Sequence, residues 1–116
     1  MSVLIEVFNE RMRQIEKEGF SKEHDDQHVN QELLIAANLY YQKAIKDEPE
    51  GSKIPSEWPW EPEWWKPKDK HHNLIVAGAL IIAEGSRRIR NGVKEKPIYD
   101  LTLRDIAQEI KTAKKN

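Results

Sequence analysis

Prolines divide this chain into two helical parts. Five of the six stand at positions 49, 55, 59, 62 and 67, all within residues 47–68. A proline inside a helix removes a hydrogen bond and clashes with the preceding turn, and inside a sheet it removes a ladder bond. Residues 47–68 therefore form neither a helix nor an interior strand, and we expect a long loop there, with regular elements on both sides.

The rest of the sequence predicts helices. Apolar residues recur at spacings of three and four, and no long stretch alternates with a period of two. We expect helices at about 2–18, 30–46, 69–90 and from 102 onward, which form a small all-α bundle of about four helices in a single domain, 1–116. The apolar positions predicted to face the core are Leu4, Phe8, Met12 and Ile15, then Leu33, Leu34, Ala37, Tyr41, Ala44 and Ile45, then Leu74, Ala77, Gly78, Ile81 and Ile82, and finally Leu103, Ile106, Ala107 and Ile110.

Residues at the expected helix ends support these limits. Asn30 and Thr102 can each accept a hydrogen bond from the first turn of the helix that follows. Gly19 and Gly92 come directly after the first and third helices, where a left-handed residue commonly ends a helix. The small residues at 77–79 predict that another helix approaches the third helix closely.

All four tryptophans, at positions 58, 60, 64 and 65, lie in the proline-rich loop. Ordering a loop of this length costs conformational entropy, although proline has already restricted the unfolded chain. Burial of large aromatic rings can offset that cost. We therefore expect the loop to be ordered with at least two tryptophans in the core, which leaves one or two to face a ligand.

Composition excludes several classes of protein. The chain has no cysteine and a net charge of −1, so it forms no disulfide and has no thiolate nucleophile, as expected of a cytoplasmic protein. The longest apolar run, 74–83, is much shorter than the ~18 residues of a membrane span. Bases outnumber acids in residues 86–116, but in the basic segment and helix at 93–116 they alternate with acids, so nucleic-acid binding is not expected.

The sequence HDDQH at 24–28 has two histidines four residues apart, as in the zinc-binding HExxH motif, with Asp25 at the place of the glutamate. A zinc site would need a third ligand, for which His71 and His72 are candidates. The alternative is that Asp25 or Asp26 caps a turn and that the histidines anchor a loop. We favour this alternative and predict no metal and no cofactor.

Carboxylates form a second candidate set. Magnesium-dependent nucleotide pyrophosphohydrolases of the MazG type collect pairs of acids from two facing helices of a bundle. Here the second helix offers only Glu32 and the third only Glu84, with Ala36 and Ala77 where further acids are needed. We keep this enzyme class as an alternative and assign no catalytic residue. The acids considered are Glu18, Asp25, Asp26, Glu32, Asp69 and Glu84.

Four segments carry a resemblance to known proteins. ERMRQIEKEGF at 10–20, EHDDQH at 23–28, WPWEPEWWKPKD at 58–69 and AGALIIAE at 77–84 together resemble a set of small phage and prophage proteins. More distantly, residues 14–26 and the tryptophan segment are similar to passages of ryanodine-receptor (RyR) repeat domains. Phe20 stands where those domains have tryptophan and His24 where they have arginine. The resemblance implies a compact helical module that binds a nucleotide or a nucleotide-derived signal.

These observations lead to one main hypothesis and two alternatives. The main hypothesis is a non-enzymatic phage-type module that binds a nucleotide-derived ligand and sequesters it in the host cytoplasm. In this picture arginine or lysine meets a phosphate and a tryptophan stacks on a base. The alternatives are the pyrophosphohydrolase and a protein-interaction module, including a homo-oligomer built through the third helix. The predicted ligand-binding residues are Arg11, Arg13, Glu18, Phe20, His24, Asp25, Asp26, His28, Trp58, Trp60, Trp65, Lys66 and Asp69.

Overall fold

The structure, a computed structural model, describes residues 3–18, 31–46, 53–92 and 99–114. These ranges contain helices and no strand, which confirms the all-α prediction. The loop at 53–69, called the tryptophan loop below, connects to the third of the described α-helices and contains one short turn of 3-10 helix. The elements are α1 (Val3–Glu18), α3 (Glu32–Lys46), η1 (Pro62–Trp64), α4 (Lys70–Asn91) and α5 (Leu103–Lys114).

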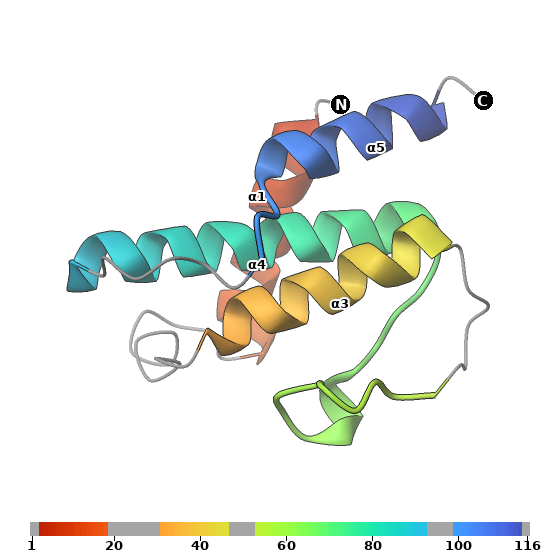
Figure 1. Ribbon diagram of the computed structural model, residues 1–116. Coiled ribbons are helices and arrows are strands. Elements are labelled where there is room, and N and C mark those ends of the chain that lie inside the picture. Colours follow the sequence, from red (N-terminus) through yellow and green to blue (C-terminus); the bar gives the residue numbers. More distant parts are fainter. Residues whose placement is uncertain (1–2, 19–30, 47–52, 93–98, 115–116) are drawn as a thin grey trace.

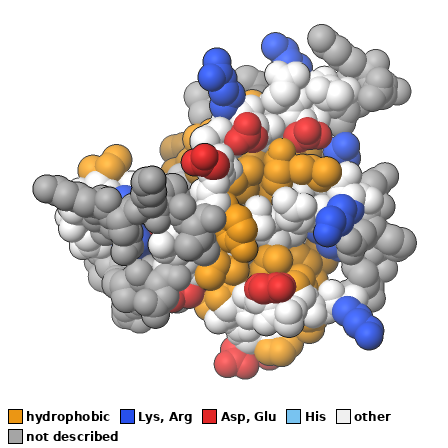
Figure 2. All heavy atoms as spheres, in the orientation of Figure 1, with side chains coloured by type: hydrophobic (Ala, Val, Ile, Leu, Met, Phe, Trp, Pro, Cys, Tyr) orange, Lys and Arg blue, Asp and Glu red, His pale blue; other side chains and the backbone are white. Residues whose placement is uncertain are grey.

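Helix α4 is the centre of the fold. It contacts each of the other three α-helices, and its contact with α3 is the most extensive. Figure 1 shows α3 running alongside α4, α1 crossing α4 steeply on another side, and the tryptophan loop hanging below the end of α3. Figure 2 shows one face of this assembly, on which apolar side chains reach the surface near the centre and charged side chains surround them.

The ends of α4 and α5 follow local sequence signals. Asp69 accepts a hydrogen bond from the backbone N–H of His72 at 2.8 Å and so caps α4. Gly92, with φ of 61°, ends the same helix in the left-handed conformation that glycine adopts without strain. At α5 the backbone N–H of Asp105 donates to the Thr102 hydroxyl, and the Asp105 carboxylate accepts from the Thr102 backbone N–H at 3.0 Å. These predicted ends are confirmed.

A glycine sets the approach of α1 to α4. A Cβ atom at Gly78 would lie 3.0 Å from one methyl carbon of Val7 and 3.2 Å from the other. Most real Cβ contacts are longer than this, so any side chain at position 78 would push Val7 away by a few tenths of an ångström. The predicted close approach at 77–79 is thus confirmed, and its partner is Val7 of α1.

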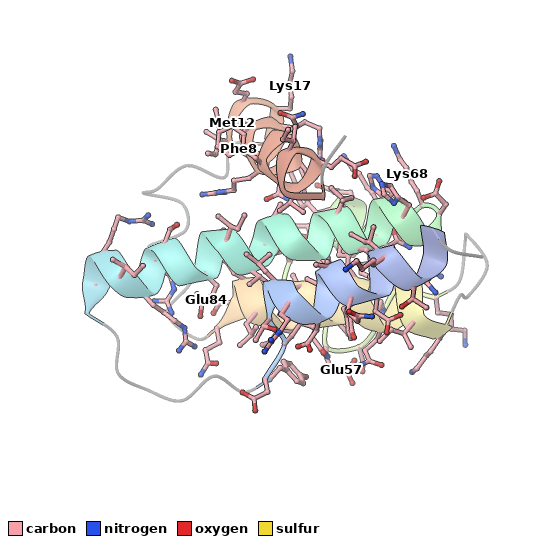
Figure 3. The ribbon with its side chains drawn as sticks, turned by 90° about the horizontal axis from the view of Figure 1, so that it is seen from above. Phe8, Met12, Lys17, Glu57, Lys68 and Glu84 are labelled. Atoms are coloured by element: carbon pink, nitrogen blue, oxygen red, sulfur yellow. The ribbon has the colours of Figure 1, made fainter. Side chains whose placement is uncertain are left out.

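The predicted core face of α1 is wrong. Phe8 is 59% exposed and Met12 is 37% exposed, and Figure 3 shows both side chains on the side of α1 that points away from α4. Leu4 is not among the described side chains; among those of α1 that are, the buried ones are Val7, Glu10, Arg11 and Gln14, one helical face that contains three polar residues. Docking of Val7 against Gly78 explains the orientation, since it turns the Val7 side inward and the Phe8 stripe toward solvent.

Smaller corrections apply to the other helices. In α3, Tyr40 is buried where Tyr41 was expected, and Ile45 is exposed. The buried stripe runs through Ala36, Ala37, Tyr40 and Ala44 because small residues let α3 lie close to α4 there. The remaining predicted core positions that are only partly buried, or exposed at the surface, are Ile15, Ile81, Ile82, Leu103 and Ala107.

None of the helices in the described ranges is both long and apolar enough to cross a membrane.

Candidate functional site

Four aromatic rings form a cluster between the tryptophan loop and α3. Trp65 lies 4.7 Å from Tyr40 and 4.9 Å from Trp58, measured between ring centroids. Trp58 also meets Trp60 edge to face, with centroids 5.3 Å apart, and meets Tyr40 at 6.0 Å. Tilted and edge-to-face pairs at these distances are favourable beyond their buried area. The cluster attaches the loop to the helical core.

Polar contacts hold the loop at three further points. The backbone N–H of Lys66 donates to the Tyr40 hydroxyl at 2.9 Å. The buried Asn73 side chain accepts from the N–H of Lys68 at 2.8 Å and donates to the carbonyl of Lys68 at 3.0 Å. Trp58 Nε1 donates to the carbonyl of Glu61 at 3.1 Å, inside the loop. The positions of Lys66 and Lys68 are therefore set by α3 and α4.

A cavity of about 340 Å³ lies between α1, α3, the tryptophan loop and α4. The aromatic wall comes from the tryptophan loop and Tyr40 of α3, the polar wall comes from α1, and α4 adds the apolar residues Val76 and Leu80. Cavities that hold small molecules commonly have this mixture of apolar surface and a few placed polar groups. The lining residues are Glu10, Arg13, Gln14, Tyr40, Trp58, Trp60, Trp64, Lys66, Lys68, His72, Val76 and Leu80.

The polar wall is a chain of hydrogen bonds along α1. Arg13 donates to both carboxylate oxygens of Glu10, through Nε at 2.8 Å and Nη2 at 2.7 Å. Gln14 Nε2 donates to the same Glu10 carboxylate at 3.3 Å. Gln14 Oε1 is buried and accepts from no donor among the described residues. A buried polar atom without a partner lowers the free energy of unfolding by about 1–3 kcal/mol, so this oxygen destabilises the folded protein.

Positive charge predominates in the lining. Lys66 Nζ lies 5.1 Å from the centroid of the Trp64 ring, in the geometry of a cation–π contact. Lys68 and Arg13 add two more cations, and Glu10 is the one carboxylate among the lining residues. The cavity therefore combines aromatic faces with a surplus of cations, which suits a planar ligand that carries negative charge.

His72 joins the cavity from the first turn of α4. Burial lowers its pKa below the usual 6.5, and the Lys68 ammonium lowers it further. The carboxylates of Glu10 and Asp69 act in the opposite direction, and Arg13 adds a smaller lowering effect. The imidazole is therefore neutral at pH 7, when it can donate through one ring nitrogen and accept through the other.

This lowered pKa predicts a pH dependence of stability. Well above pH 6.5 the His72 ring is neutral in both the folded and the unfolded chain, and it adds no pH dependence. Below pH 6.5 the unfolded chain binds a proton at His72 that the folded chain binds less well. We expect the free energy of unfolding to fall between pH 6.5 and 5.5, and urea denaturation at several pH values measures it.

The variant His72→Gln is expected to lose part of this pH dependence. The matched control is His71→Gln, which removes the neighbouring exposed imidazole and leaves His72 in place. Equal slopes of unfolding free energy against pH for wild type and His72→Gln would contradict the assignment.

A second, shallower hollow of about 410 Å³ adjoins the cavity. The two share Glu10, Arg13 and His72 as lining residues. In this hollow His71 Nε2 lies 2.8 Å from Glu6 Oε1 and ties the start of α4 to α1. The hollow is more acidic than the cavity, since its lining includes two glutamates and the helix cap Asp69.

The structure brings only some of the predicted ligand-binding residues together. Arg13, Trp58, Trp60 and Lys66 line the cavity. Trp65 is buried in the core behind it, Asp69 caps α4 and lines the second hollow, and Arg11 is buried outside both hollows. The side chain of Glu18 and the residues Phe20, His24, Asp25, Asp26 and His28 lie outside the described part of the chain.

The tryptophans are less buried than expected. Trp65, at 9% exposure, is the one tryptophan in the buried core, and Trp58 and Trp60 are partly buried against it. Trp64, the last residue of the 3-10 turn, lines the cavity. Three tryptophans therefore face the cavity, where one or two were expected.

The candidate metal ligands at 24–28 lie outside the described part of the chain. In the described ranges no group of three or more histidines or acids could hold a metal ion. Glu84 is buried, and its carboxylate accepts from Arg87 Nε at 2.7 Å and from Arg88 Nε at 2.9 Å. Both carboxylate oxygens of Glu84 thus accept hydrogen bonds from guanidinium groups, which gives this acid a structural role.

Several cavity residues were not among the predicted set. Glu10 and Gln14 lie on the same face of α1 as Arg13 because their spacings are three and four. That spacing was visible in the sequence, but the apolar stripe of Phe8 and Met12 favoured the wrong face. The others that were missed are Tyr40, Trp64, Lys68 and His72.

Comparisons with family models, curated proteins and solved structures found no match to this chain. The resemblance to phage proteins and to RyR repeat domains therefore stays a prediction based on the four quoted segments.

Proposed function

We propose that this protein binds a small anionic ligand with a planar ring, a nucleotide or a nucleotide-derived signal, in the cavity between α1 and the tryptophan loop. One observation carries the proposal. Three tryptophans and a tyrosine line the cavity together with two lysines and an arginine, against a single carboxylate. Aromatic rings beside cations are the groups that stack on a base and neutralise a phosphate.

The size of the cavity supports a ligand no larger than a mononucleotide. Cavities that hold drug-sized ligands measure roughly 300–1,000 Å³, and this one, at about 340 Å³, is at the lower end. A dinucleotide would have to extend into the adjoining hollow. The acids Glu6, Glu10 and Asp69 there oppose a second phosphate.

The positions of the cations suggest how such a ligand lies. Lys66 and Lys68 border the aromatic wall, and hydrogen bonds to Tyr40 and Asn73 fix their backbone. A ring that stacks on an indole places its phosphate near these two ammonium groups. We propose binding without turnover, and the resemblance to phage proteins suggests sequestration of a host signal. The pyrophosphohydrolase alternative gains no support from Glu84, which two arginines engage.

Calorimetric titration with AMP, GMP, CMP and UMP tests the proposal, with tryptophan fluorescence as a second readout from inside the cavity. We expect at least one of the four to bind with a Kd in the micromolar range. Absence of binding by all of them at high micromolar concentration, in both assays, would contradict the proposed function.

Lys68→Gln removes one cation from the cavity and is expected to weaken that binding about 5- to 30-fold, the effect of losing about 1–2 kcal/mol from a charge-assisted hydrogen bond. The matched control is Lys111→Gln, which removes an exposed lysine of α5 that does not line the cavity. Equal affinities of Lys68→Gln and wild type would show that the phosphate lies elsewhere.

A further inference from the structure

We propose that Gln14 selects ligands whose ring edge carries an N–H donor, an inference that rests on the proposed function of the cavity. Gln14 is 1% exposed and lines the cavity. Its Oε1 is buried with no donor among the described residues. An acceptor in this situation favours a ligand that supplies the missing donor and rejects one that does not.

The orientation of the Gln14 amide follows from its neighbours. Arg13 donates two hydrogen bonds to the Glu10 carboxylate, one to each oxygen, which fixes this carboxylate in place. An ionised carboxylate only accepts hydrogen bonds, so the NH₂ of Gln14 must be the group that faces it, 3.3 Å away. The amide oxygen therefore points away from Glu10. A flipped amide would place two acceptors against each other.

The aromatic wall determines which part of a ligand meets this oxygen. In the proposed pose a planar ring stacks on Trp58, Trp60 or Trp64 and turns its edge toward Gln14, which lines the same cavity. The NH₂ of Gln14 stays on Glu10, so the ring edge itself must bring a donor to Oε1. An amino group on the ring then donates to Oε1, whereas a bare ring nitrogen or a C–H leaves the oxygen without a partner.

Two pairs of mononucleotides test the effect of the ring amino group alone. AMP is compared with purine riboside 5′-monophosphate, which is AMP without its amino group. CMP is compared with pyrimidin-2-one riboside 5′-monophosphate, which is CMP without its amino group. In the wild-type protein we expect the amino compound of at least one pair to bind about 10- to 100-fold more tightly than its partner, measured by calorimetry.

Gln14→Met keeps the length of the side chain and removes the amide. This variant is expected to reduce the preference for the amino compound to less than threefold, chiefly by weakening the binding of that compound. The matched control, Gln108→Met on the exposed surface of α5, is expected to keep the wild-type preference. Because the comparison of ligands in the wild type needs no variant, the test survives even if Gln14→Met fails to fold.

The outcomes separate the two proposals. Equal affinities within both pairs in the wild type, or a preference that persists in folded Gln14→Met, would overturn the role of Gln14 and leave the proposed function standing. Failure of these four compounds to bind, together with failure of GMP and UMP, would overturn both.

Discussion

Replacement of Trp65 by alanine is expected to lower the free energy of unfolding by about 3–5 kcal/mol, the usual cost of deleting a buried aromatic ring. Trp65 is the most buried tryptophan, and its ring contacts both Tyr40 of α3 and Trp58 of the tryptophan loop. Its loss opens a cavity where the loop meets the core and loosens Trp58 as well. Urea denaturation followed by far-UV circular dichroism measures the change.

Trp65→Phe is the matched variant for this prediction. Phenylalanine keeps a ring against Tyr40 and removes the indole N–H, which is buried and has no acceptor among the described residues. We expect it to retain more than half of the stability that alanine loses. A loss of less than about 1 kcal/mol in Trp65→Ala would show that the tryptophan loop contributes little to folding.

The same substitution tests the integrity of the cavity. Trp58 and Trp60 line the cavity and pack on each other, and Trp65 supports Trp58 from behind. Near-UV circular dichroism of Trp65→Ala is therefore expected to lose signal from the other indoles, beyond the contribution of one missing ring.

Local signals in the sequence predicted most of the fold correctly. Asp69, Gly92 and Thr102 act on the backbone within a few residues of themselves, so their effect does not depend on the rest of the molecule. The five prolines likewise exclude regular structure from the loop wherever it packs. Helix limits and the all-α class could thus be read from single short stretches.

The orientation of α1 could not be read in this way. Its apolar stripe, with Phe8 and Met12, predicts burial of that side by periodicity alone. The fit of Val7 against Gly78 involves two residues far apart in sequence, and it turns a polar face inward. A buried face with Glu10 and Gln14 is stable here because a hydrogen-bonded network and a cavity, and not a closed core, lie on that side.

The sequence indicated the types of residue in the candidate site but not all of its individual residues. Aromatic rings next to arginine and lysine were expected near the first helix, and Arg13, Trp58, Trp60 and Lys66 lie together in the cavity. Their use by a ligand stays a prediction. Sequence periodicity does not show which of two adjacent tryptophans at a 3-10 turn lines the cavity and which lies in the core, so Trp64 was missed.

Glu84→Ala is expected to lower the free energy of unfolding by about 3–5 kcal/mol, the usual cost of removing one partner of a buried ion pair. Arg87 is 1% exposed, and both its Nε and its Nη2 donate to Glu84, at 2.7 and 3.1 Å. Without the carboxylate this buried guanidinium loses two hydrogen bonds and the negative charge of Glu84. Arg88, which also donates to Glu84, in addition donates to Gln31 at 3.2 Å and so connects α4 to the start of α3.

Glu16→Ala on the exposed face of α1 is the matched control, and we expect it to change stability by no more than about 0.5 kcal/mol. Glu84→Gln should fall between the two, because an amide keeps one acceptor oxygen but no charge. A loss below about 1 kcal/mol in Glu84→Ala would contradict the structural role of the ion pair. Natural domains are stable by only about 5–15 kcal/mol, so the expected loss is enough to unfold a marginally stable protein. A Glu84 variant that does not hydrolyse nucleotides must therefore first be shown to be folded. Only then would its inactivity support the pyrophosphohydrolase alternative.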